Sequence, residues 1–185
     1  MVGLHMKQGG QLNKNTIVAT VMSNLGFFLM GERNDIHIEQ TKVGDRYVLE
    51  RMKEIGASLG GEQSGHIIFL DENTTGDGLL SALHLLQVIV ETGKPLSELT
   101  KVMEVMPQAL VNAKVPNHKK EKYMDYSEIA DAITELNRKF AGEGRVLIRP
   151  SGTEPLVRVM IEGKDQKMID TEAKKLAELI QNIML

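Results

Sequence analysis

The order of the apolar segments constrains the fold of this chain more than any other feature. Short β-branched runs such as 16–22 alternate with longer segments in which apolar residues recur at helical spacing. These segments predict strands and helices in turn, at 16–22, 23–31, 36–38, 47–55, 67–70 and from Thr74 or Thr75 to Gly93. Such alternation is typical of a mainly parallel α/β layer. We expect this layer to be incomplete, because no strand precedes residue 16 and three strands leave apolar surface uncovered.

The pattern changes after about residue 106. Three strands and two amphipathic helices are expected in the order β-α-β-β-α, with strands at 110–115, 145–149 and 156–161 and helices around 129–140 and 168–183. This order predicts a small α+β domain with both helices on one face of its sheet. Pro107 interrupts the preceding helical segment, so the predicted domains are 1–106 and 107–185.

Composition excludes several classes of protein. The 185 residues include no cysteine, which rules out disulfides and thiolate metal sites. A net charge of -3 and an aromatic content of 4% argue against a nucleic-acid partner. No apolar run reaches the ~20 residues that would span a bilayer. We therefore expect a soluble, cytoplasmic protein without membrane or nucleic-acid partners, and with a possible tendency to self-associate through exposed apolar surface.

The turn between the last two strands has the chemistry of an anion site. It reads Arg-Pro-Ser-Gly-Thr-Glu-Pro over 149–155 and offers hydroxyls, an approachable glycine and an arginine. The aliphatic residues of each strand share one face, which places Arg149 and Arg158 together on the other face. Two guanidinium groups there could hold a phosphate. A solvent-exposed hairpin with scattered arginines is the alternative.

A glycine-rich segment, Gly-Glu-Gln-Ser-Gly-His over 61–66, precedes the strand at 67–70. Glu62, Ser64 and His66 alternate, so an extended backbone would project all three to one side. A carboxylate and a hydroxyl so placed suit sugar hydroxyls, and the imidazole could transfer a proton near neutral pH. The alternative is a polar strand entry with a hydrogen-bonded histidine.

No metal site is predicted. The five histidines lack ligand spacing, and His84 lies in a leucine-rich helix where a buried, hydrogen-bonded role is expected. Asp77 stands alone at a helix start and is expected to be a cap.

Together the two loops resemble those of the α-D-phosphohexomutase superfamily. The segment 61–66 resembles its sugar-binding loop, and 149–158 is similar to its phosphate-binding loop. The segments Lys-Val-Gly-Asp-Arg-Tyr-Val at 42–48 and Thr-Thr-Gly-Asp-Gly at 74–78 resemble the phosphoglucosamine mutase branch. The likeness runs from about Asn15 to the end of the chain.

The resemblance implies a four-domain enzyme, of which this chain holds most of the third domain and all of the fourth. Members of the branch interconvert glucosamine 6-phosphate and glucosamine 1-phosphate, a step toward UDP-N-acetylglucosamine and cell-wall precursors. A phosphoserine in the first domain donates its phosphoryl group, giving a bisphosphate intermediate, and an Asp-rich loop in the second domain holds Mg²⁺. Neither segment occurs here, so the missing N-terminal domains are expected partners and this chain alone is expected to be inactive.

The resemblance also implies roles for individual residues. Glu62 and Ser64 would hold sugar hydroxyls of a phosphosugar, and Lys42 and His66 match positions near the transferred group, where a general acid or base is needed. The non-reacting phosphate would be held by five residues of the second loop: Arg149, Ser151, Gly152, Thr153 and Arg158.

Two other functions remain open on the sequence. A mutase acting on mannose or glucose phosphates would share the Glu62 and Ser64 pattern. In a non-catalytic phosphosugar-binding module, the absence of a nucleophile would be a native property of the protein.

Overall fold

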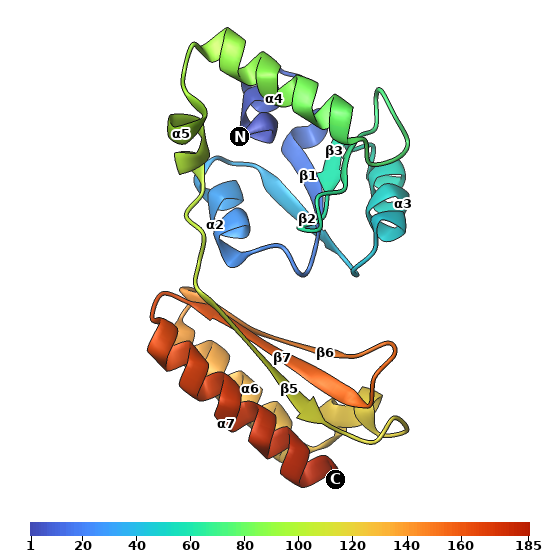
Figure 1. Ribbon diagram of the computed structural model, residues 1–185, viewed down its shortest axis with the longest axis vertical. Helices are drawn as coiled ribbons and strands as arrows, with labels where there is room; N and C mark the ends of the chain where they lie inside the picture. The colour runs from blue at the N-terminus through green and yellow to red at the C-terminus, as the bar shows by residue number, and fades with distance from the viewer. The chain divides into compact units, whose positions relative to one another are not determined.

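The chain divides into two units, Met1–Val105 and Met106–Leu185, in a computed structural model that describes residues 1–185 (Figure 1). Four strands form the sheet of the first unit: β1 (Thr16–Thr20), β2 (His37–Thr41), β3 (Leu59–Gly61) and β4 (Ile67–Phe69). Their order is β2-β1-β3-β4; the first three are parallel, and β4 runs antiparallel to β3. The predicted mainly parallel α/β layer is confirmed.

Helices cover both faces of this sheet. They are α1 (Val2–Gln8), α2 (Leu25–Arg33), α3 (Asp45–Ile55), α4 (Gly78–Thr92) and the short α5 (Leu96–Leu99). Alternation along β1 explains the layers, because Ile17 joins a core with residues of α1, α2 and α4 while Val18 joins a second core with α3. The sheet is therefore sandwiched between helical layers.

Three features of this unit differ from the prediction. Helix α1 and strand β3 were not foreseen, and α4 begins at Gly78 rather than at Thr74 or Thr75. Gly60, directly before the glycine-rich segment, lies within β3, where a Cβ would come 2.5 Å from Met52 Sδ. Its missing side chain allows α3 to pack directly on the strand.

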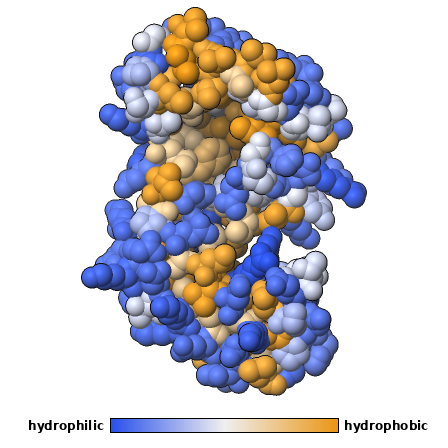
Figure 2. All heavy atoms as spheres, viewed as in Figure 1, coloured by the Kyte–Doolittle hydropathy of each residue, from blue (hydrophilic) through white to orange (hydrophobic).

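Helix α4 exposes an apolar stripe. Leu79 is 74% exposed and Val90 is 79% exposed, and Leu83 and Leu86 between them are more than half exposed. Figure 2 shows apolar atoms gathered over this helix, beside a hollow. A cavity of about 420 Å³ lies against the face of the sheet that carries Ile17, lined mostly by apolar side chains. The first unit thus exposes an apolar face, as predicted, and self-association through it remains a prediction.

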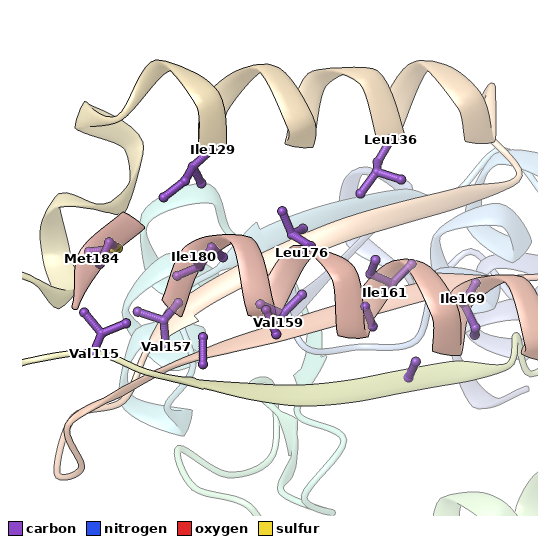
Figure 3. Close-up of a cluster of buried hydrophobic side chains, with 14 of the residues drawn as sticks. Val115, Ile129, Leu136, Val157, Val159, Ile161, Ile169, Leu176, Ile180 and Met184 are labelled. Carbon is purple, nitrogen blue, oxygen red and sulfur yellow. The ribbon is translucent and has the colours of Figure 1, made fainter. Parts of the chain in front are cut away.

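The second unit is a three-stranded antiparallel sheet covered by helices. Its elements are β5 (Gln108–Lys114), α6 (Ser127–Phe140), β6 (Gly144–Pro150), β7 (Leu156–Gly163) and α7 (Gln166–Met184), with strand order β5-β7-β6. Figure 3 shows both helices contributing side chains to one core, on the face of the sheet that carries Val157, Val159 and Ile161. The predicted β-α-β-β-α order, with both helices on one face, is confirmed. No helix in the chain has the length and apolarity that a membrane crossing requires.

Candidate functional site

The first cluster of predicted site residues lies where parallel strands of the first unit end. Lys42 directly follows β2, and Glu62 directly follows β3. Carboxyl ends of parallel strands commonly form ligand sites. The two loops are joined by one hydrogen bond, in which the Gly44 amide donates to Glu62 Oε1 at 2.7 Å. Gly44 has a φ of 133°, a backbone conformation that favours glycine.

The segment 62–66 is a tight turn and not the extended segment that was predicted. The Glu62 amide donates to the His66 carbonyl at 2.9 Å, and Gly65 turns the chain with a φ of 97°. The turn still brings the three side chains together. Ser64 Oγ donates to Glu62 Oε2 at 3.1 Å and lies 3.3 Å from His66 Nδ1.

The segment 74–78 lies against this turn. A Cβ on Gly76 would come 3.2 Å from the His66 side chain, so glycine permits the close approach. Asp77 Oδ1 accepts hydrogen bonds from the amides of Leu79 and Leu80, which confirms it as the cap of α4. His84 Nε2 lies 2.6 Å from Glu72 Oε1, and its ring stacks on Phe69, so its predicted hydrogen-bonded role is also confirmed.

Replacing Glu62 by alanine is expected to accelerate hydrogen exchange of the Gly44 amide by about tenfold to a hundredfold, because a charge-assisted bond contributes ~1.5–3 kcal/mol. Exchange followed by NMR would measure this change. Glu50→Ala is the matched control, since it removes only a surface pair with Arg46 at 2.8 Å. An unchanged Gly44 rate in Glu62→Ala would show that the bond does not hold the loop.

The second cluster lies in the hairpin between β6 and β7. Arg149 and Arg158 are direct cross-strand partners, and Asn112 of β5 pairs with Arg158 in turn. Directly paired residues project to the same face. That face is opposite the helices, because Val157 and Val159 point into the core. The predicted juxtaposition of the two arginines is therefore confirmed.

The positive charges of Arg149 and Arg158 are only partly balanced by a carboxylate. Arg158 Nη2 donates to Glu154 Oε2 at 3.0 Å, whereas its Nε is buried without a hydrogen-bond partner. Arg149 forms no ion pair with a carboxylate in the structure. Like charges directly opposite each other on a sheet are destabilising, so an anion bound between Arg149 and Arg158 would relieve their repulsion.

The turn itself is internally braced. Ser151 is buried, and its Oγ accepts a hydrogen bond from the Glu154 amide at 3.2 Å, while Gly152 and Thr153 are exposed. Lys120 Nζ donates to the carbonyls of Ser151 and Glu154. Lys120 belongs to a 3-10 helix, Lys120–Asp125, between the predicted strand at 110–115 and the predicted helix around 129–140. No periodic pattern distinguishes this lysine from its neighbours, so sequence reasoning missed it.

Each cluster lies within its own unit. The first holds Lys42, Glu62, Ser64 and His66, and the second holds Arg149, Ser151, Gly152, Thr153 and Arg158. No group of three or more His, Asp or Glu side chains gathers where it could hold a metal ion.

Comparison with protein families covers both units. Residues 1–106 match phosphoglucomutase/phosphomannomutase, alpha/beta/alpha domain III, and residues 110–179 match the phosphoglucomutase/phosphomannomutase C-terminal domain.

Among curated relatives, phosphoglucosamine mutase of Ruminiclostridium cellulolyticum is 61% identical over 181 residues, which are 98% of this chain and 40% of that protein. Phosphoglucosamine mutase of Acetivibrio thermocellus is 58% identical over the same share of each chain. The chain thus spans about 40% of the length of these relatives.

Solved structures share the fold. N-acetylphosphoglucosamine mutase of Aspergillus fumigatus superposes with a TM-score of 0.73 at 18% identity, over 99% of this chain and 43% of that one. A putative phosphomannomutase of Thermus thermophilus gives a TM-score of 0.60 at 22% identity, over 96% and 39%.

Proposed function

This chain belongs to the phosphoglucomutase/phosphomannomutase family, and from that premise we propose that it forms the sugar- and phosphate-binding part of a phosphoglucosamine mutase. The reaction would interconvert glucosamine 6-phosphate and glucosamine 1-phosphate. Phosphoglucosamine mutases that are 56–61% identical to almost the whole chain support this substrate. Their greater length supports the view that the remaining machinery lies outside these residues.

The observation that carries the proposal is the facing pair of arginines at the hairpin. Arg149 and Arg158 lie opposite each other, and one carboxylate, that of Glu154, pairs with Arg158 while Arg149 has no carboxylate partner. A phosphate dianion would supply the missing negative charge and accept bidentate bonds from a guanidinium. Thr153 and the Gly152 amide are exposed beside it. We assign this hairpin to the phosphate that does not react.

The turn at 62–66 is assigned to the sugar. The Glu62 carboxylate, oriented by the Gly44 amide, would accept hydrogen bonds from sugar hydroxyls, and Ser64 would add a donor. His66 of this turn and Lys42, which directly follows β2, are both exposed. They are the candidates for moving a proton at the hydroxyl that gains or loses the phosphoryl group.

Magnesium does not fit the residues of this chain. A structure of Aspergillus fumigatus N-acetylphosphoglucosamine mutase holds GlcNAc-6P and magnesium. Here no cluster of three or more candidate ligands exists, and Mg²⁺ in phosphoryl transfer is held by carboxylates and substrate phosphates. We therefore assign both the metal and the nucleophile to the rest of the enzyme.

A chimera tests the proposal. The portion of the Ruminiclostridium cellulolyticum relative that precedes its match would be joined to this chain, and turnover of glucosamine, glucose and mannose phosphates compared. We expect preferred turnover of glucosamine phosphates, and no conversion by the 185-residue chain alone at any magnesium concentration. Glu62→Ala in the chimera should lower kcat/KM by about tenfold to a hundredfold, and Glu50→Ala should leave it unchanged.

Other outcomes would contradict the proposal in distinct ways. Conversion by the purified chain alone would show that it holds a complete active site. Faster turnover of glucose or mannose phosphates by the chimera would favour the other mutases of the family. A folded chimera that binds phosphosugars without converting any of them would favour a non-catalytic binding module.

A further inference from the structure

We propose that Lys120 is a positioning residue of the phosphate loop, which fixes the backbone of 151–154 and adds a positive charge to the anion site. The inference rests on the proposed phosphate-binding function of that loop. It concerns a residue 29 positions before Arg149, in a segment without any recognisable phosphate motif.

The contacts of Lys120 span the loop. Its Nζ donates to the carbonyl of Ser151 and, at 3.4 Å, to the carbonyl of Glu154. These are the first and last residues of the Ser-Gly-Thr-Glu turn, so one ammonium group joins both ends. The exposed Gly152 and Thr153 lie between the two fixed points. A loop held at both ends keeps the amides between them in one arrangement, which lowers the entropy lost when an anion binds.

The 3-10 helix that carries Lys120 is itself attached to the hairpin. Tyr123, one turn further along the same 3-10 helix, donates its hydroxyl to the Ile148 carbonyl of β6 at 3.3 Å. Burial raises the pKa of Tyr123, with a smaller contribution from Glu121, so the hydroxyl keeps its proton at neutral pH. Lys120 therefore projects from a support attached to the same hairpin that carries Arg149.

The charge of Lys120 is not neutralised. Its two acceptors are carbonyls, and the ion pairs of the structure do not include it. Arg149, Arg158 and Lys120 thus place three positive charges around the loop, against the single negative charge of Glu154. The electrostatic attraction for a phosphate dianion is correspondingly greater than two arginines would provide.

A neighbouring lysine provides a matched comparison. Lys119 Nζ donates to the carbonyl of Met184 at 3.0 Å and to the terminal carboxylate of Leu185 at 3.4 Å, at the end of α7. Lys119→Met therefore removes one positive charge and two contacts to main-chain oxygens, as Lys120→Met does, but away from the phosphate loop. The pair separates a local role at the anion site from a general loss of charge or anchoring.

The experiment is a titration of inorganic phosphate into the full 185-residue chain, followed through the amides of Ser151, Gly152 and Thr153. We expect Lys120→Met to weaken binding by about tenfold and to accelerate hydrogen exchange of the Ser151 and Leu156 amides without phosphate. Lys119→Met should bind within about twofold of the parent. Lys120→Gln, which keeps donors without charge, should recover the slow exchange but bind more weakly than the parent at low salt, with a smaller difference at high salt.

Two results would overturn the proposal: parent-like binding by Lys120→Met, or an equal loss in Lys119→Met. If Lys120→Met unfolds the second unit, Lys120→Gln decides, because parent-like binding and salt dependence in that variant would also refute the charge contribution. Failure of the underlying function looks different. In that case the loop amides of the parent do not respond to phosphate at all, whichever lysine is present.

Discussion

Phosphate binding is expected to weaken by about tenfold to a hundredfold when Arg158 is replaced by lysine. The formal charge is unchanged, but the planar fork is lost, and each hydrogen bond to a charged group contributes ~1.5–3 kcal/mol. Arg158 has guanidinium donors left for phosphate, because it makes one side-chain hydrogen bond, from Nη2 to Glu154. The parent itself should bind at roughly millimolar affinity, about -4 kcal/mol, since the site is open to water.

The measurement is the same titration of the loop amides with inorganic phosphate. Arg138→Lys, at an exposed position near the end of α6, is the matched control and should bind as the parent does. Equal affinity in Arg158→Lys, or a response confined to amides outside 151–153, would refute the assignment of this hairpin as the phosphate site.

The unfolding free energy of the second unit provides a second measurement on the pair Arg149 and Arg158. Arg149→Met should also weaken phosphate binding, yet it removes repulsion between directly opposed like charges. The second unit should therefore gain up to about 1 kcal/mol of unfolding free energy at low salt. A variant that merely damaged the fold would lose both phosphate affinity and stability. Weaker phosphate binding together with a higher unfolding free energy would therefore identify the hairpin as a binding site.

The second large effect is expected in the core beneath that hairpin. Replacing Leu176 by alanine should lower the unfolding free energy of the second unit by about 2–5 kcal/mol. Leu176 lies on α7, is 2% exposed, and packs in the cluster that includes Val159 and Ile161 (Figure 3). Truncating it leaves a cavity in the core that also supports the strands carrying both arginines, so phosphate binding should fall as the unit unfolds.

Leu110→Ala makes the same chemical change at a position that is 54% exposed on β5. It should change stability by no more than about 0.5 kcal/mol. Hydrogen exchange of the β7 amides, measured against urea, reports on this unit separately from the first. Similar losses in the two variants would mean that the helices do not form the principal core on this face.

The sequence by itself determined the faces of the strands of the second unit and the order of its helices and strands. Parity along β6 and β7 was sufficient to place Arg149 and Arg158 on the side away from the helices, because side chains alternate in any strand. The cap at Asp77 was equally local, since its carboxylate bonds amides two and three residues ahead. Such features depend on neighbours within a few positions, and a single sequence contains them in full.

Tertiary structure decided the contacts that turn these elements into sites. It paired Arg149 directly with Arg158, joined Glu62 to Gly44 across 18 positions, and brought Lys120 to the Ser151 carbonyl across 31. It also made a strand of Leu59–Gly61, where two glycines hid the pattern and where close packing of α3 against Gly60 holds the strand in place. These contacts depend on strand register and on how helices pack, and both are set by the burial of side chains distant in the chain. Local periodicity does not indicate which distant residue a side chain will contact. Only the folded chain could therefore identify the residues that shape each loop.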